Sequence, residues 1–159
     1  MNRVMDDVII TRAGASDAEA VLALIRRAFT PVAEQYDDFG MAPLAETLDE
    51  HRARYARQVV LKATDANGRI LGTVQGELRP DGSCYVGRLA VEPSAQRRGL
   101  GSALALALET EYPEADRFEL FTGHLSHETI GLYHSLGYRE THRDVQDERL
   151  TLVWMEKTR

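Results

Sequence analysis

The hydrophobic residues follow a helical period in the first third of the chain and an extended period after it. A short apolar run over 8–10 predicts a strand. Residues 16–29 begin with a capping box and place their apolar side chains on one face, which predicts a helix that Pro31 ends. Apolar residues recur at helical spacing over 43–55, with a proline in the first turn, so a second helix is predicted there.

From Gln58 onward the pattern becomes that of strands joined by turns. Asp-Ala-Asn-Gly and Pro-Asp-Gly separate three apolar runs, which predicts an antiparallel meander. A helix, a strand, a short helix and a final hairpin follow. The predicted elements of this part are 59–61, 70–78, 83–91, 100–108, 118–122, 128–136, 138–143 and 150–155. The order β-α-α-β-β-β-α-β-α-β-β predicts an α/β fold with a mixed, mostly antiparallel central sheet, a β-α-β crossover and helices on both faces.

Composition indicates one ordinary globular domain over residues 1–159. The chain is 43% hydrophobic and 28% charged, without repeats or low-complexity tracts. No apolar run reaches the roughly 20 residues that a membrane span needs, and the N-terminus lacks the apolar region of a signal peptide. We therefore expect a cytoplasmic protein with no membrane partner. The single cysteine, Cys84, excludes an internal disulfide and is expected to be a small buried residue.

The net charge of −6 is concentrated in one segment. Residues 31–50 hold six acidic and no basic side chains, whereas the rest of the chain balances 19 acidic against 19 basic residues. A net negative chain argues against general binding of nucleic acids or anionic membranes. The acidic segment could attract a protonated amine, or its charges could simply be solvated on a helix and a loop.

A glycine-containing segment between a strand and a helix carries the clearest chemical signal. Residues 96–101, Gln-Arg-Arg-Gly-Leu-Gly, follow the strand that ends at Val91 and open the next helix. Glycines let a backbone approach a ligand closely, and a helix N-terminus presents unpaired N–H groups with a partial positive charge. The segment 88–98 has a local charge of +2. It suits a pyrophosphate, although the two glycines could also simply ease the turn, and neither the P-loop nor the dinucleotide pattern is matched.

This segment resembles the acetyl-CoA motif Q/R-x-x-G-x-G/A of the GNAT N-acetyltransferase superfamily. Residues 130–138, Ile-Gly-Leu-Tyr-His-Ser-Leu-Gly-Tyr, are similar to the family pattern that ends L-Y-x-x-x-G-F/Y. The resemblance covers nearly the whole chain. It implies that acetyl-CoA is a cosubstrate, bound where the strands ending at Val91 and Thr122 separate. The residues that it implies for acetyl-CoA binding are Leu89, Ala90, Val91, Gln96, Arg97, Arg98, Gly99, Leu100, Gly101, Ser102, Ser126 and Tyr133.

Acetyl transfer to an amine needs a base for the ammonium, a donor to the oxyanion and an acid for the thiolate. The resemblance assigns the acid to Tyr133, unless that ring only packs beneath the cosubstrate. A strand bulge would turn the main-chain N–H of Leu89 or Val91 outward as the oxyanion donor.

The general base departs from the family pattern. Some members carry a glutamate in the strand that precedes the glycine segment, but residues 83–87 hold no carboxylate. Glu77 on the preceding strand is the nearest acidic candidate, and it could equally be a solvated strand residue. Tyr85 could line the cleft or relay a proton through a water molecule.

The resemblance places the acidic segment on the acceptor side of the cleft. We therefore expect the acceptor to be a small cationic amine or an amine of a peptide or protein. The residues expected to bind it are Glu34, Tyr36, Asp37, Asp38, Phe39 and His124. His124 and His127 stand three residues apart, but no third ligand has a matching spacing, so we expect no metal.

Two other classes of function fit the same residues. The chain could be a non-catalytic acyl-CoA sensor, or an interaction module that binds the phosphate of a nucleotide or a partner. Tyr133 beside the glycine segment favours an enzyme over a sensor, and the strand over 87–91 favours coenzyme A over a bare phosphate. The expected function is acetyl-CoA-dependent N-acetylation of a primary amine by direct attack in a ternary complex, by a monomer or a homodimer.

Overall fold

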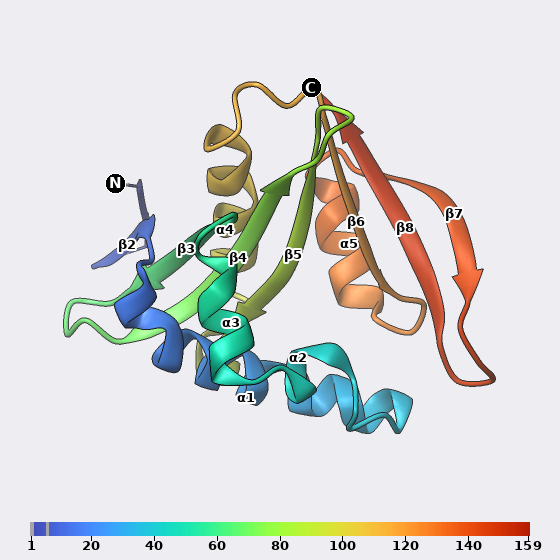
Figure 1. The fold of residues 1–159 in the computed structure, drawn as a ribbon, viewed down its shortest axis with the longest axis horizontal. Coiled ribbons are helices and arrows are strands. Elements are labelled where there is room, and N and C mark those ends of the chain that lie inside the picture. The colour runs from blue at the N-terminus through green and yellow to red at the C-terminus, as the bar shows by residue number, and fades with distance from the viewer. Residues whose placement is uncertain (1, 6) are drawn as a thin grey trace.

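One sheet runs through the molecule (Figure 1), and the computed structural model describes residues 2–5 and 7–159. The eight strands have the order β1-β2-β3-β4-β5-β6-β8-β7. Every neighbouring pair is antiparallel except β5 and β6, which are parallel and flank a helical crossover. The mixed, mostly antiparallel sheet predicted from the sequence is therefore confirmed. The strands are β1 (Asn2–Met5), β2 (Val8–Arg12), β3 (Val59–Thr64), β4 (Ile70–Leu78), β5 (Ser83–Val91), β6 (Arg117–Gly123), β7 (Arg139–Val145) and β8 (Thr151–Thr158).

Helices cover both faces of the sheet. They are α1 (Ala18–Tyr36), α2 (Ala42–Ala45), α3 (Leu48–Arg54), α4 (Leu100–Thr110) and α5 (His127–Ser135). On one face α1 contacts β4 and β5, and on the other α4 contacts β3, β4 and β5. Glycines of β4 let α4 lie close, because a Cβ on Gly72 would come within 2.7 Å of Leu104 Cδ1. Within the described residues, no helix is both long enough and apolar enough to cross a membrane.

The first helix continues beyond Pro31, where the sequence pattern predicts its end. A proline inside a helix removes one backbone hydrogen bond and crowds the preceding turn. The last turns of α1 nevertheless bury Ala33 completely and leave only 4% of Tyr36 exposed. This burial compensates for the lost bond. The helix ends at Tyr36, and its C-cap residue, Asp37, adopts a left-handed conformation with φ 51°.

The helix predicted over 43–55 is divided into α2 and α3. Glu46 interrupts it with an extended conformation, φ −61° and ψ 130°. Thr47 then starts α3 with a capping box, in which its hydroxyl accepts from the Glu50 N–H and the Glu50 carboxylate accepts from the Thr47 N–H. The break turns Glu46 toward the sheet, where its side chain is buried.

Candidate active site

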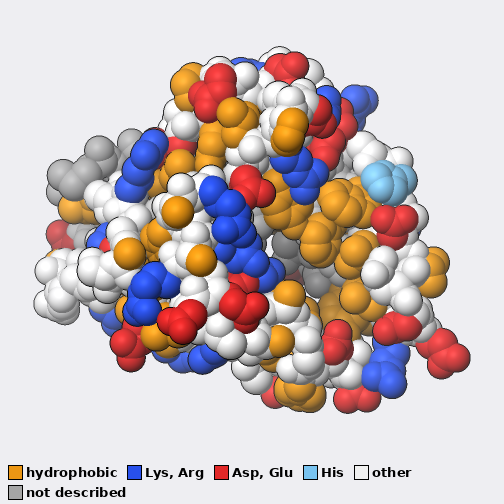
Figure 2. All heavy atoms as spheres, viewed as in Figure 1, with side chains coloured by type: hydrophobic (Ala, Val, Ile, Leu, Met, Phe, Trp, Pro, Cys, Tyr) orange, Lys and Arg blue, Asp and Glu red, His pale blue; other side chains and the backbone are white. Residues whose placement is uncertain are grey.

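The parallel strands β5 and β6 separate after a short paired stretch. They pair only from Ser83 with Arg117 to Tyr85 with Glu119, so residues 86–91 of β5 have no partner on β6. Figure 2 shows a hollow near the middle of one face, over the place where these strands part, with basic side chains on one rim and apolar ones on the other. The separation predicted between the strands ending at Val91 and Thr122 is present.

A bulge in β5 lies beside this gap. On β4 the pairing advances two residues, from Thr73 to Gln75, while on β5 it advances three, from Ala90 back to Gly87. Arg88 takes up the extra residue with a left-handed conformation, φ 53°. The bulge therefore precedes Leu89 directly, one of the two positions at which an outward amide was predicted.

The N-terminus of α4 points its amides at open space. Gly99 precedes the helix with φ 80°, and no side chain caps it. Among the described residues, no acceptor bonds the N–H groups of Leu100, Gly101 or Ser102. Such a terminus can bind an anion through its free donors and the helix dipole.

The residues around this terminus make different contacts. The Gln96 amide donates to the Val91 carbonyl at 3.1 Å and ties the loop to the end of β5. Arg97 pairs with Glu128 of α5 at 2.6 Å on the surface, and Arg98 makes no ion pair with any described residue. A Cβ on Gly101 would lie 3.2 Å from Leu132 Cδ1, so this glycine allows α4 and α5 to pack closely.

The two predicted catalytic tyrosines lie on α5 and on β5, the strand that borders the gap. Tyr133 of α5 is 4% exposed, and its ring packs edge-on against Tyr138 with centroids 5.2 Å apart. Burial raises the pKa of Tyr133, and the phenol of Tyr85 adds a smaller effect, so the hydroxyl is protonated at neutral pH. Burial likewise raises the pKa of Tyr85, whose ring lies between the Arg79 guanidinium at 4.5 Å and the Phe121 ring at 6.1 Å. The Tyr133 hydroxyl makes no hydrogen bond with any described residue.

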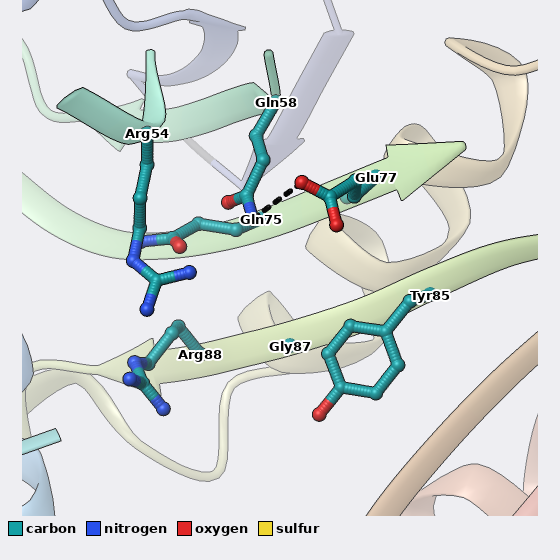
Figure 3. Close-up of a pocket in the computed structure, with 8 residues that line it drawn as sticks. Arg54, Gln58, Gln75, Glu77, Tyr85, Gly87 and Arg88 are labelled. Carbon is teal, nitrogen blue, oxygen red and sulfur yellow. Dashed lines mark hydrogen bonds between the residues drawn. The ribbon is translucent and has the colours of Figure 1, made fainter. Parts of the chain in front are cut away.

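A cavity of about 150 Å³ lies between α3 and the strands β4 and β5. Figure 3 shows Arg54 reaching in from α3 above, Arg88 from β5 below, and the amide of Gln75 extending along β4 toward Arg54. The predicted candidates Glu77 and Tyr85 line the other end, opposite each other on paired strands. The full lining is Arg54, Gln58, Gln75, Gly76, Glu77, Tyr85, Gly87 and Arg88.

A buried carboxylate holds the two arginines of this cavity. Glu46 accepts from Arg54 Nε and Nη2, both at 2.8 Å, and from Arg88 Nη2 at 3.1 Å. Burial opposes ionisation of Glu46, but the hydrogen bonds from both arginines outweigh it and lower the pKa of the carboxyl. His51 Nδ1 lies 3.4 Å from Glu46 Oε1. Because burial lowers the pKa of His51, we regard its imidazole as neutral rather than as a third cation.

Glu77 is engaged by neighbouring polar groups. Its carboxylate accepts from Arg57 Nε at 3.0 Å and from the Gln58 amide at 3.3 Å (Figure 3). Its side chain is 34% exposed, so water can reach it. A role for Glu77 as the base stays a prediction.

The predicted acceptor residues lie in or just after the last turns of α1, apart from His124 between β6 and α5, and none of them lines this cavity. The Tyr36 hydroxyl forms a hydrogen bond of 3.1 Å with Ser126 Oγ and accepts another from the Leu125 N–H. The centroid of the Tyr36 ring lies 5.9 Å from that of the His124 ring. The structure thus brings Tyr36, Ser126 and His124 together in one cluster. Asp37 pairs with Arg149 of the β7–β8 loop at 3.3 Å. The remaining predicted residues, Glu34, Asp38 and Phe39, lie nearby and contribute to neither the cluster nor the cavity.

Comparison with known families agrees with this geometry. The sequence model of the acetyltransferase (GNAT) family matches residues 19–138, which is most of the chain. The chain belongs to the GNAT acetyltransferase family. No curated protein sequence matches this GNAT chain.

Solved GNAT structures share the fold at low sequence identity. The ribosomal-protein-S18-alanine N-acetyltransferase of Escherichia coli has a TM-score of 0.77 at 21% identity, covering 95% of this chain and 93% of its own. A GCN5-related N-acetyltransferase from Kribbella flavida has a TM-score of 0.79 at 17% identity, with 97% and 99% covered. A putative acetyltransferase from Salmonella typhimurium, solved with its cofactor acetyl-CoA, has a TM-score of 0.77 at 20% identity, with 96% and 94% covered.

Sequence reasoning missed the polar residues of the cavity in this GNAT chain. Arg54 lies in the predicted second helix and Gln58 just after its end, where such polar side chains are typical of an exposed face. Arg88 was counted only in the local charge of +2 over residues 88–98. Gln75 offered a usable signal, because it interrupts a run of apolar and small residues over 70–76 that the structure buries on both faces.

Proposed function

We propose that the protein transfers the acetyl group of acetyl-CoA to a primary amine, by direct attack in a ternary complex. The observation that carries the proposal is the stretch 86–91 of β5, which has no partner on the β6 side and contains a bulge, followed after a short loop by the α4 terminus with free amides. An extended ligand with amide groups can pair with such a strand edge, while its phosphates bind at the helix terminus. Coenzyme A has both features in one molecule, so the residues present fit it.

The donor site is assigned residue by residue. The amides of Arg98, Gly99, Leu100, Gly101 and Ser102 would bind the pyrophosphate, with the unpaired Arg98 side chain nearby. Leu89, Ala90 and Val91 would offer main-chain groups to the pantetheine arm. Ala90 can contribute only through its backbone, because its side chain is buried against Val21 and Ile25 of α1. Arg97 must leave Glu128 if it is to reach a phosphate.

A few groups of this chain are assigned to the proton transfers and to the oxyanion of the reaction. The amine loses a proton, its nitrogen forms a bond to the thioester carbonyl carbon, and the C–S bond breaks to release a thiolate. Tyr133 is protonated and has no partner among the described residues, so it is assigned as the donor of a proton to that thiolate. The amine proton passes to Glu77, or to a water relayed by Tyr85. Solvent then takes up that proton and returns one to the Tyr133 phenolate, so the net products are the amide and the free thiol. The N–H of Leu89 after the bulge is assigned to the oxyanion.

Direct attack is favoured because the one cysteine of the chain, the usual nucleophile for an acetyl-enzyme, is not available at the gap. Cys84 is fully buried, and burial raises the pKa of its thiol to about 12. A thiol in that state supplies little thiolate for an acetyl-enzyme intermediate. The amine must therefore meet the thioester itself.

The test measures release of free thiol from acetyl-CoA against a panel of primary amines, with calorimetric titration of acetyl-CoA in parallel. We expect binding with release that depends on the amine. Binding of acetyl-CoA without thiol release for any amine would indicate an acyl-CoA sensor and not an enzyme. Failure to bind acetyl-CoA, together with binding of simple nucleotides, would instead indicate a phosphate-binding module.

A further inference from the structure

The cavity beneath α3 contains a buried hydrogen-bond donor without a partner. Gln75 is 3% exposed, and its Nε2 makes no hydrogen bond with any described residue. An unsatisfied buried polar group costs about 1–3 kcal/mol, so one that is retained in a cavity calls for an explanation. Gln75 lines the cavity, and Figure 3 shows its amide beside Arg54, so this donor lies next to a space that a small ligand could fill.

The two arginines beside Gln75 also have unused donors. Arg54 commits Nε and Nη2 to Glu46, which leaves Nη1 with no acceptor among the described residues. Arg88 commits only Nη2. Two guanidinium groups share one carboxylate, and Glu77 at the far end is paired with Arg57, so the charge around Gln75 is positive by about one unit. An anion with planar oxygens fits these donors, since arginine forks match a carboxylate.

The cavity is small and lies against the strand that borders the gap. Its volume of about 150 Å³ is below the roughly 300–1,000 Å³ of pockets for drug-sized ligands. Gly87 and Tyr85 line it on β5, the strand that borders the gap. A group bound by Arg54, Arg88 and Gln75 therefore lies only a short extension from the place where an amine would be acetylated.

We infer that this cavity binds the carboxylate of the acceptor, so that the substrate is a small amine that also carries a carboxylate, as a free amino acid does. This inference rests on the proposed N-acetyltransferase function and narrows its acceptor. The amine at the start of a peptide lacks a neighbouring carboxylate and fits less well. Gln58 Oε1, which is also buried without a partner, is an acceptor available to an N–H of the same ligand.

The first arm of the test compares amino acids with their carboxamides as acceptors, side chain by side chain. We expect kcat/KM to be at least about 10-fold higher for the carboxylates, mainly through KM, because a charged hydrogen bond contributes about 1.5–3 kcal/mol. Equal use of amides and simple amines would overturn the inference and leave the acetyltransferase function standing.

The second arm uses Gln75→Leu and Gln75→Glu. Neither leaves a former partner unpaired, since the Gln75 amide has none among the described residues. Gln75→Leu is therefore expected to fold with an unchanged or higher Tm. Gln75→Glu buries a carboxylate beside two arginines, so its Tm is measured as well. Gln75→Leu should reduce the carboxylate preference about 10-fold, and Gln75→Glu should abolish it by placing a like charge beside the ligand. The control is Arg52→Gln, which removes an exposed charge on α3 that, among the described residues, pairs only with Asp49, at 3.7 Å.

The third arm needs no turnover. Calorimetry compares an N-acetyl amino acid with its carboxamide on the wild-type protein and on Gln75→Leu. Binding that depends on both the carboxylate and Gln75 supports the site even if acetyl transfer fails. No binding of the carboxylate form, or equal binding by Gln75→Leu, would overturn the inference and indicate that Gln75 is satisfied by water alone.

Discussion

The two halves of the proposed site are built from the sequence in different ways. The donor half lies within residues 86–102, where a bulge, a left-handed glycine and a helix terminus follow one another along the chain. The acceptor half joins α3 to two strands, and its arginines are 34 positions apart, as their numbers 54 and 88 show. Local chemistry is readable from a segment, whereas a cavity between distant elements depends on how those elements pack.

Charge shows the same difference between the two halves. The local charge of +2 over 88–98 is a property of one segment, although Arg88 turns inward to Glu46 and only Arg98 is free of ion pairs with described residues. The acidic segment over 31–50 does not act as a unit. Glu46 is buried between arginines, Glu50 caps α3 and Asp37 binds Arg149, and none of the acidic residues of this segment lines the cavity.

Tyr133→Phe is expected to have the largest effect and tests the proposed acid, which lies on α5 outside the donor half. Loss of a general acid lowers kcat by about 100-fold to 10,000-fold, while acetyl-CoA affinity stays within about 2-fold because the ring remains. Steady-state kinetics and calorimetry measure the two quantities. Tyr138→Phe serves as the matched control, since that buried hydroxyl donates to Glu109 instead. An unchanged kcat in Tyr133→Phe would reduce this residue to a packing role.

Glu46→Gln tests the ion network that shapes the acceptor half. Losing one partner of a buried pair costs about 3 kcal/mol of unfolding free energy, which urea titration at neutral pH measures. The lowered pKa of Glu46 means that its contribution exists above the ordinary glutamate pKa of about 4.3 and is lost as the pH falls through the lower folded value. The wild type should therefore lose more stability than Glu46→Gln on acidification below pH about 4. Parallel losses in both proteins would contradict this role.

Two glycine substitutions give the smallest expected effects and contrast conformation with space. A Cβ on either Gly99 or Gly131 meets no atom within 4 Å, but only Gly99 has a positive φ, at 80°. Gly99→Ala should cost about 1–2 kcal/mol through left-handed strain and weaken acetyl-CoA binding roughly 10-fold by displacing the amides that follow. Gly131→Ala, in the exposed middle of α5, should stabilise by about 0.5–1 kcal/mol and leave binding unchanged. Thermal melts and calorimetry separate these outcomes.

The fold was largely predictable because its strands carry strong local signals. The bounds of β4 and β5 match the prediction to the residue, since Asn-Gly and Asp-Gly turns delimit apolar runs. The helices before them were predicted less well. Proline and helical periodicity are local signals, whereas burial of Ala33 and Tyr36 and the inward turn of Glu46 depend on tertiary packing.

The candidate site divides along the same line. Its glycine segment and Tyr133 could be predicted because a motif in consecutive residues carries them. Gln75 and Arg54 could not, because their significance arises only when β4 and α3 are brought together around a cavity. The expected bulge could be anticipated in β5, but its place at Arg88 is set by the register with β4.

Initial rates measured over a grid of acetyl-CoA and acceptor concentrations test the central claim most directly. If donor and acceptor occupy separate halves of the site and meet at the gap, double-reciprocal plots will show intersecting lines, and no acetylated protein will accumulate without acceptor. Parallel lines, together with an acetylated protein detected by mass spectrometry, would show a covalent intermediate and contradict direct attack in a ternary complex.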